Sequence, residues 1–227
     1  MIIFGLDLGQ ALDYTALVAV NKRLVRNPDY MVRHDLLEIK QDPMVGMTKE
    51  YQVPHVERFP LGTTYPQIIT MLTDRINALN LQGNYMCVPD ATGVGRPVVD
   101  MLRKNGIACT PVSITGGEKE QFDEQFGGWR VPKRVLVSLL QVLLQNGQLK
   151  FAANMPHVDL IVNELAHFKV KVTEAKHDTY EAWREGDHDD LVLALALAVW
   201  YAVRFTSTEE EQKQPIPESP WVKVKGL

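Results

Sequence analysis

Cysteine, long apolar runs and a strong excess of one charge are all lacking from this chain of 227 residues. Its two cysteines, Cys87 and Cys109, lie in apolar stretches, which predicts reduced core residues of an intracellular protein rather than a disulfide or a metal pair. The longest apolar run, Leu191 to Val203, has 13 residues, which is shorter than the ~20 that cross a bilayer. It therefore predicts a buried helix and no membrane span. No basic and apolar leader precedes the first predicted strand, which argues against a secretory signal. A net charge of −4 gives no overall signal for nucleic acid.

The order of the apolar segments predicts one α/β domain. The length suffices for one domain with a sizeable core and is short for two. Two apolar stretches separated by the turn-prone GQALDY predict a strand hairpin. Strands and helices then follow in an order that predicts a mixed sheet with helices on its faces. The expected strands cover residues 2–8, 14–20, 84–90 and 107–114, with further strand pieces within 21–62, and the expected helices cover 65–80, 96–104, 131–146, 156–167 and 189–205.

Three segments are expected to lie outside this core. Residues 115–128 are polar and rich in glycine, which predicts a mobile loop. The stretch from Lys169 to Trp183 alternates on both sides of a polar centre, which predicts an inserted β-hairpin before the last helix. Residues 206–227 are polar and contain proline, which predicts a poorly packed tail and leaves residues 1–205 as the domain.

Lone carboxylates stand at the ends of elements that should be buried. Asp7 lies in the first strand, Asp90 ends the apolar CVPD, and Asp189 and Asp190 begin the most apolar helix. Burying an unpaired carboxylate is unfavourable, and clustered carboxylates raise one another's pKa. A hard divalent cation resolves both conflicts, and all-oxygen ligands suit Mg²⁺ or Mn²⁺. Two such ions can activate a water and stabilise the leaving oxygen of a phosphodiester.

Each acid also has a purely structural interpretation, which stays open at this stage. Asp7 could cap a turn, and Asp90 could begin an Asx-turn that leads to Thr92. Asp189 and Asp190 could serve the first turn of a helix, where the helix dipole favours acids. The combination is more specific than any one element, so we interpret the four acids as candidate metal ligands.

Five segments together resemble the nuclease domain of phage terminase large subunits, within the ribonuclease H-like superfamily. They occur in the order of that family and lie within residues 1–205, and DATGVG and HDDLVLALALA are the most specific parts. The segments are GLDLGQALDYTALV, VPDATGVGRPVVDML, TPVSITGG, VPKRVLVSLLQVLLQNGQLKF and GDHDDLVLALALAVW.

The resemblance implies a ribonuclease H-like fold and cleavage of double-stranded DNA with two Mg²⁺ or Mn²⁺ ions. By matching motifs, Asp7, Asp90 and either Asp190 or Asp189 would be the catalytic metal ligands. Adjacent helical residues point ~100° apart, and both of the last two could reach one metal cluster. The implied partners are double-stranded DNA, a terminase ATPase motor domain, the small terminase subunit and the portal, in the cytoplasm of an infected bacterial host.

One part of a whole terminase large subunit has no counterpart in the sequence. The family carries a P-loop ATPase ahead of the nuclease, and no G-x-x-x-x-G-K-[ST] pattern occurs here. We therefore expect either an excised domain or a protein whose motor lies elsewhere.

Basic residues give a weaker indication of DNA binding. They gather in KRLVR (22–26), in WRVPKR and in the predicted hairpin, where Lys169 and Lys171 would face the same side of a strand. A solvated surface is the alternative for each group. The candidate DNA-binding residues are Lys169, Lys171, Lys176, Arg130, Lys133 and Arg134.

Three other functions compete with this interpretation. A Holliday-junction resolvase or a transposase-like nuclease would share the acids and differ in its DNA substrate. A sugar-kinase or actin-like ATPase fragment also carries G-x-D-x-G in its first strand, but such proteins need two domains around a nucleotide. A non-catalytic packaging scaffold could retain the fold, although the intact set of acids argues against it.

Overall fold

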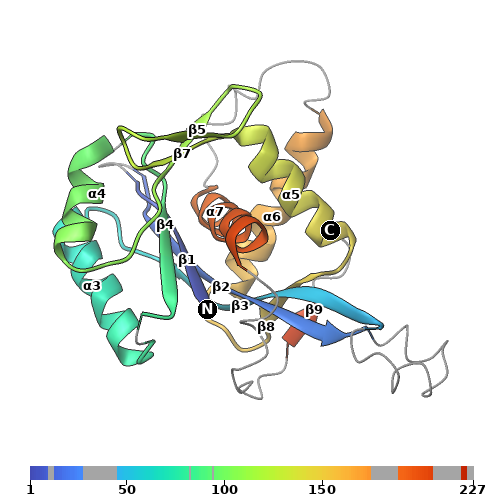
Figure 1. Ribbon diagram of the computed structural model, residues 1–227. Coiled ribbons are helices and arrows are strands. Elements are labelled where there is room, and N and C mark those ends of the chain that lie inside the picture. Colours follow the sequence, from blue (N-terminus) through green and yellow to red (C-terminus); the bar gives the residue numbers. More distant parts are fainter. Residues whose placement is uncertain are drawn as a thin grey trace.

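The computed structural model describes residues 1–9, 13–27, 45–81, 83–93, 95–174, 189–206 and 221–223. Within these residues, six strands form a mixed sheet in the order β4-β1-β2-β3-β8-β9, and three form a second sheet in the order β5-β7-β6 (Figure 1). The strands are β1 (Ile2–Asp7), β2 (Ala16–Arg26), β3 (Met47–Arg58), β4 (Tyr85–Pro89), β5 (Val112–Thr115), β6 (Gln121–Asp123), β7 (Gly128–Pro132), β8 (Leu149–Ala152) and β9 (Trp221–Lys223). The helices are α3 (Tyr65–Ala78), α4 (Gly95–Lys104), α5 (Lys133–Gln145), α6 (Val158–Glu174) and α7 (Asp190–Phe205).

The centre of the main sheet follows the predicted order. Strands β1 and β2 form the expected antiparallel hairpin, and β2 continues into an antiparallel pair with β3. Strand β4 lies parallel to β1 on the other side. The prediction of a mixed sheet is confirmed, and the strands that lead to Asp7 and Asp90 are neighbours in it.

Helices cover both faces of this sheet, as predicted. Helices α3 and α4 lie on one face, and α5, α6 and α7 lie on the other (Figure 1). Alternate residues of β1 serve the two layers, because Ile3 packs with the α7 side and Phe4 with the α3 side. Helix α7 is buried along most of its length, and Trp200 within it is fully buried. The prediction of a buried last helix is confirmed, and no helix in the described ranges is long and apolar enough to cross a membrane.

Helix α7 approaches β1 very closely at Gly5. A Cβ at this position would lie 1.8 Å from the carbonyl oxygen of Ala194 and 3.0 Å from the backbone nitrogen of Ala198. Only a residue without a side chain permits this contact. The glycine of GLDLG therefore sets the height of α7 above the sheet.

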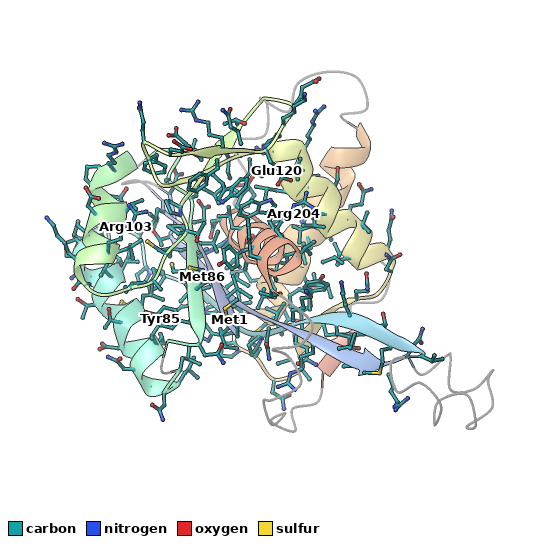
Figure 2. The ribbon with its side chains drawn as sticks, viewed as in Figure 1. Met1, Tyr85, Met86, Arg103, Glu120 and Arg204 are labelled. Atoms are coloured by element: carbon teal, nitrogen blue, oxygen red, sulfur yellow. The ribbon has the colours of Figure 1, made fainter. Side chains whose placement is uncertain are left out.

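The second sheet extends the first one beyond β4. Parallel bridges join Cys87 to Cys109 and Asp90 to Val112. An ion pair of 2.6 Å between Glu120 and Arg204 ties the segment before β6 to the end of α7, and Figure 2 shows these two side chains above the helix. Residues 115–128, expected as a loop, thus contain β6, which pairs antiparallel with β7. The prediction missed this strand because glycine and acidic residues dominate the composition of the segment.

Two other predictions at the carboxyl-terminal end need correction. Helix α6 runs on to Glu174, so the first half of the predicted hairpin, from Lys169, is helical. The other half lies outside the described residues. Strand β9, within the predicted tail, pairs with β8, so these three residues are part of the sheet. The domain boundary at residue 205 stays a prediction.

The two cysteines are free, as expected. Cys87 is fully buried and Cys109 is partly buried. Burial raises the pKa of both thiols, so both favour the neutral form. Cys87 belongs to the core cluster beneath α3 and α4, and Cys109 packs against that cluster from its edge.

Candidate active site

Asp7 and Asp90 end two neighbouring parallel strands. Asp7 is the last residue of β1, and Asp90 follows β4 directly. The backbone N–H of Asp90 donates to the carbonyl oxygen of Leu6 over 2.8 Å, which continues the ladder between the strands. Neighbouring strands lie ~4.8 Å apart, so the two carboxylates start from adjacent positions at one edge of the sheet.

A row of residues extends from Asp7 across the next two strands. Asp7 is opposite Ala16 of β2, and Ala16 is opposite Arg58 of β3. Residues directly opposite each other share a face, so the side chains of Asp7 and Arg58 are on the same side, about 10 Å apart at their backbones. Ala16 packs in the core on the α7 side, which places the whole row beneath that helix.

Asp90 is held by the loop that follows it. Its Oδ1 accepts hydrogen bonds from the backbone N–H of Thr92 at 2.8 Å and from the hydroxyl of Thr92. The same hydroxyl oxygen accepts the N–H of Ile114 at 2.8 Å, which connects the loop to β5. This is the Asx-turn of the structural interpretation, so that alternative is confirmed for one oxygen. An oriented carboxylate is also what a metal ligand needs, and the two roles are compatible.

Asp190 meets Arg58 at the first turn of α7. The Arg58 Nε donates to Oδ2 of Asp190 at 2.8 Å and its Nη2 donates to Oδ1 at 3.0 Å, a bidentate pair. Nη2 also donates to Oε1 of Glu164 on α6, and the guanidinium lies 4.8 Å from the ring centre of Tyr14. Asp190 is 7% exposed and Glu164 is 9% exposed. Arg58 therefore joins two buried carboxylates from two helices to the sheet.

The electrostatics of this cluster are strongly perturbed. Burial raises the pKa of Glu164 from 4.5 to about 8, and the neighbouring carboxylate of Asp190 acts in the same direction. Arg58 and the backbone N–H groups of Leu191 and Val192 act in the opposite direction. One oxygen of Glu164, Oε2, is buried without a hydrogen-bond partner. A pKa of about 8 leaves Glu164 mostly protonated at neutral pH, so Asp190 carries the negative charge opposite Arg58.

The site has the donor chemistry of a hard-cation site, although its acids are not yet arranged around one point. Asp7, Asp90 and Asp190 offer only oxygen, which suits Mg²⁺ or Mn²⁺, and the orphaned Oε2 adds a buried acceptor nearby. In the described part of the chain, no three acidic, histidine or cysteine side chains are grouped closely enough to hold a metal ion. Arg58 occupies the carboxylate of Asp190, and this contact explains part of the separation. The residues fit a metal by type, with Arg58 as the cation on one side.

Asp189 differs from its neighbour in position. It is the N-cap residue of α7, its side chain makes no capping hydrogen bond, and it is more exposed than Asp190. Its carbonyl oxygen accepts the N–H of Leu193 at 2.9 Å. Because Asp190 is the residue that contacts the sheet through Arg58, we favour it over Asp189 as the site residue.

Two of the predicted basic groups lie in different places. Strands β1, β4, β5 and β7 run parallel, and α5 begins directly after β7, so Lys133 and Arg134 lie at the same edge as Asp7 and Asp90. Arg134 donates to the carbonyl oxygen of Glu118 at 2.9 Å, and Arg130 pairs with Asp123 at 2.6 Å. The KRLVR group extends to Arg26 at the far end of β2. Arg26 is ten residues from Ala16, which corresponds to about 33 Å along the strand.

The prediction that Lys169 and Lys171 face the same side assumed a strand, and this assumption is wrong. Lys169 and Lys171 are in α6, where residues two apart point ~200° apart and not to the same side. Their side chains are not described, and Lys176 lies outside the described residues. A role of these three residues in DNA binding stays a prediction.

Arg58 and Glu164 are the residues that the sequence analysis missed. Arg58 ends a strand-like segment broken by proline, and Glu164 lies in the middle of a helix, where acids are common. One signal in the sequence was the position of Glu164, three residues after the apolar Ile161 and next to the apolar Leu165, both of which are buried on the same helix. Periodicity alone does not separate such an acid from an exposed one.

Gly5 links the fold to this site, and its replacement is our first prediction. We expect Gly5→Ala to lower the free energy of unfolding by about 1–3 kcal/mol, because the new methyl group meets the backbone of Ala194 and must displace α7. Urea unfolding followed by circular dichroism measures this change. Gly116→Ala is the matched control, since a Cβ there meets no atom within 4 Å. Equal stability of the two variants would contradict the close approach.

The strand order of the main sheet, the helices on its two faces and the row from Asp7 to Arg58 define an α/β protein with a ribonuclease H-like fold. No known protein-family model matches the chain, and no curated protein sequence does. Among solved structures, the large terminase nuclease from thermophilic phage G20c matches with a TM-score of 0.50 and 19% identity, over 91% of this chain and 83% of that chain. The structure of the same nuclease with bound zinc matches with a TM-score of 0.49 and 20% identity, over 91% of this chain and 82% of that chain. At such low identity the likeness shows the fold.

Proposed function

We propose that this chain is a divalent-metal-dependent DNA endonuclease that acts like the nuclease domain of a phage terminase large subunit. The observation that supports the proposal is the row of Asp90, Asp7 and Arg58 at one edge of the sheet, directly beneath Asp190 of α7. The sequence motifs that resemble the family fall on these elements. The fold supports the proposal and does not by itself assign an activity.

Asp7, Asp90 and Asp190 would hold the cations in this proposal. Two Mg²⁺ or Mn²⁺ ions, when bound, supply a water of lowered pKa and stabilise the leaving oxygen of a phosphodiester. Thr92 fixes one oxygen of Asp90 by two hydrogen bonds, which limits the directions in which its carboxylate can face. Arg58 balances the charge of Asp190. The contacts of Asp90, Asp190 and Arg58 thus agree with the roles proposed for these side chains.

Double-stranded DNA would approach the carboxyl edge of the parallel strands. Lys133 and Arg134 begin α5 at this edge and could contact phosphates on either side of the acids. The net charge of −4 is unfavourable for tight binding, so we expect weak and salt-sensitive association of the isolated chain.

A cleavage assay on several DNA forms tests the proposal. In Mn²⁺ or Mg²⁺, we expect slow conversion of supercoiled plasmid to nicked and linear forms, without a defined site of cleavage. Strong preference for a four-way junction over linear DNA would instead support a resolvase of the same superfamily. Absence of cleavage of every DNA form with both cations would contradict the proposed activity.

The basic residues at the sheet edge give a second prediction. We expect the double change Lys133→Ala and Arg134→Ala to lower cleavage three- to tenfold at low salt and less at moderate salt, because competing counterions already weaken the phosphate contacts that these two side chains would make. Rates at a series of salt concentrations measure this difference. Arg26→Ala, on the exposed far end of β2, is the control and should leave the rate unchanged. Equal losses for both variants would argue against a DNA path along this edge.

By the same family resemblance we propose further partners and a setting. The sequence has no P-loop, so an ATPase motor domain would have to supply translocation and control the timing of cleavage. The small terminase subunit and the portal are the other proposed partners, in the cytoplasm of an infected bacterium. The isolated chain should neither hydrolyse ATP nor respond to it.

A further inference from the structure

Arg58 contacts two acidic side chains and one aromatic ring. It is bidentate to Asp190, its Nη2 also bonds Glu164, and Tyr14 covers the guanidinium. The Arg58 side chain is 12% exposed, so these contacts are formed largely away from water. A buried guanidinium that binds two acidic side chains through Nε and Nη2, at the end of the row that begins at Asp7, is a cation built into the site.

Glu164 is a second acidic partner for the Arg58 guanidinium. Its carboxylate is almost fully buried, and Oε2 has no hydrogen-bond partner although Oε1 is bound by Arg58. Two buried acidic side chains therefore share one guanidinium, and Glu164 is within hydrogen-bond reach of Arg58 while Arg58 holds Asp190.

We infer that Arg58 is the internal counter-ion of the site, which holds Asp190 in the absence of metal and is released to Glu164 when a divalent cation binds. This inference rests on the proposed function. Nη2 already bonds both carboxylates, so Arg58 needs no large movement to exchange its bidentate grip on Asp190 for Glu164 alone. Glu164 keeps the released guanidinium paired, which avoids a buried charge without a partner. Arg58 and Glu164 are positioning residues in this scheme and need not touch DNA.

The scheme predicts changes of opposite sign in cation affinity. A guanidinium beside Asp190 competes for its oxygens and repels a divalent cation. Arg58→Met should therefore lower the dissociation constant of Mn²⁺ about tenfold or more. Glu164→Gln should raise the constant about three- to tenfold, because Arg58 then keeps Asp190 as its one charged partner. A residue with only a structural role would weaken cation binding in both variants.

Calorimetric titration of the full chain with Mn²⁺ alone, without DNA, measures these constants. The matched control is Arg75→Met: Arg75 pairs bidentately with Glu57, the neighbour of Arg58 on β3, from the opposite face of the sheet. That variant should bind Mn²⁺ like the wild type. Thermal unfolding adds a second readout, because Arg58→Met should melt lower than the wild type without Mn²⁺ and gain more stability from it. If Arg58→Met does not fold, Arg58→Lys tests the same point, since one ammonium cannot make the bidentate grip and should bind Mn²⁺ more tightly than the wild type.

The outcomes separate this inference from the proposed function. If the wild type binds Mn²⁺ and loss of the Arg58 grip leaves affinity unchanged or weaker, the counter-ion role is wrong and the nuclease proposal stands. If the wild type binds no Mn²⁺, the proposed metal-dependent activity fails and the inference fails with it. Tighter binding on loss of the grip together with weaker binding in Glu164→Gln supports the exchange.

Discussion

Asp7→Asn or Asp90→Asn is expected to reduce DNA cleavage about a thousandfold or more while the fold is retained. Each change removes a charged oxygen ligand from the proposed cation site, and a catalytic metal contributes several kcal/mol to the transition state. The two acids lie on adjacent strands, so removal of one charge also relieves repulsion. Initial rates on plasmid DNA and melting temperatures without metal measure the two effects. We expect the melting temperature to stay the same or to rise.

The design separates a catalytic role from a structural one. Asparagine keeps an oxygen that can still accept both hydrogen bonds of Thr92, so Asp90→Asn preserves the Asx-turn. Asp74→Asn, on the exposed side of α3, is the control and should keep full activity. A collapse of the fold in either site variant would assign the acid to the structure instead. Full activity in both would exclude them as metal ligands.

Removal of divalent cations is expected to stop cleavage completely. Carboxylates without a cation cannot lower the pKa of a water enough for attack on a phosphodiester at neutral pH. Excess chelator should therefore abolish plasmid cleavage, and added Mg²⁺ or Mn²⁺ in excess of the chelator should restore it. The gain in melting temperature with cation should disappear in the same chelator. Undiminished cleavage in excess chelator would contradict the two-metal proposal, whatever the other variants show.

The central part of the fold could be predicted because local pattern and tertiary packing agree there. The apolar strands that end in Asp7 and Asp90 and the apolar helix after Asp190 are buried as their composition indicates. At Lys169, local pattern and packing disagree. Alternation in FKVKV favours a strand, but the segment continues a helix whose Ile161 and Leu165 are already buried at helical spacing. Tertiary context decided in favour of the helix.

The Arg58 cluster could not be predicted, because it depends on contacts between residues distant in the chain. Arg58, Glu164 and Asp190 come from β3, α6 and α7, and the hydrogen bond from Arg58 to Asp190 spans 132 residues of sequence. No local period indicates such a meeting. The row from Asp7 to Arg58 is likewise a matter of strand register, which only the pairing of three strands establishes. Sequence patterns identified candidate acids and left their counter-charges unknown.

Anomalous diffraction from crystals soaked in Mn²⁺ tests the central claim most directly. Manganese scatters anomalously, so its positions can be assigned without reference to activity. The account predicts Mn²⁺ bound between the carboxylates of Asp7 and Asp90, with Asp190 turned toward the metal and Arg58 bound to Glu164. An anomalous map without any peak at these carboxylates, at cation concentrations that support cleavage, would contradict it.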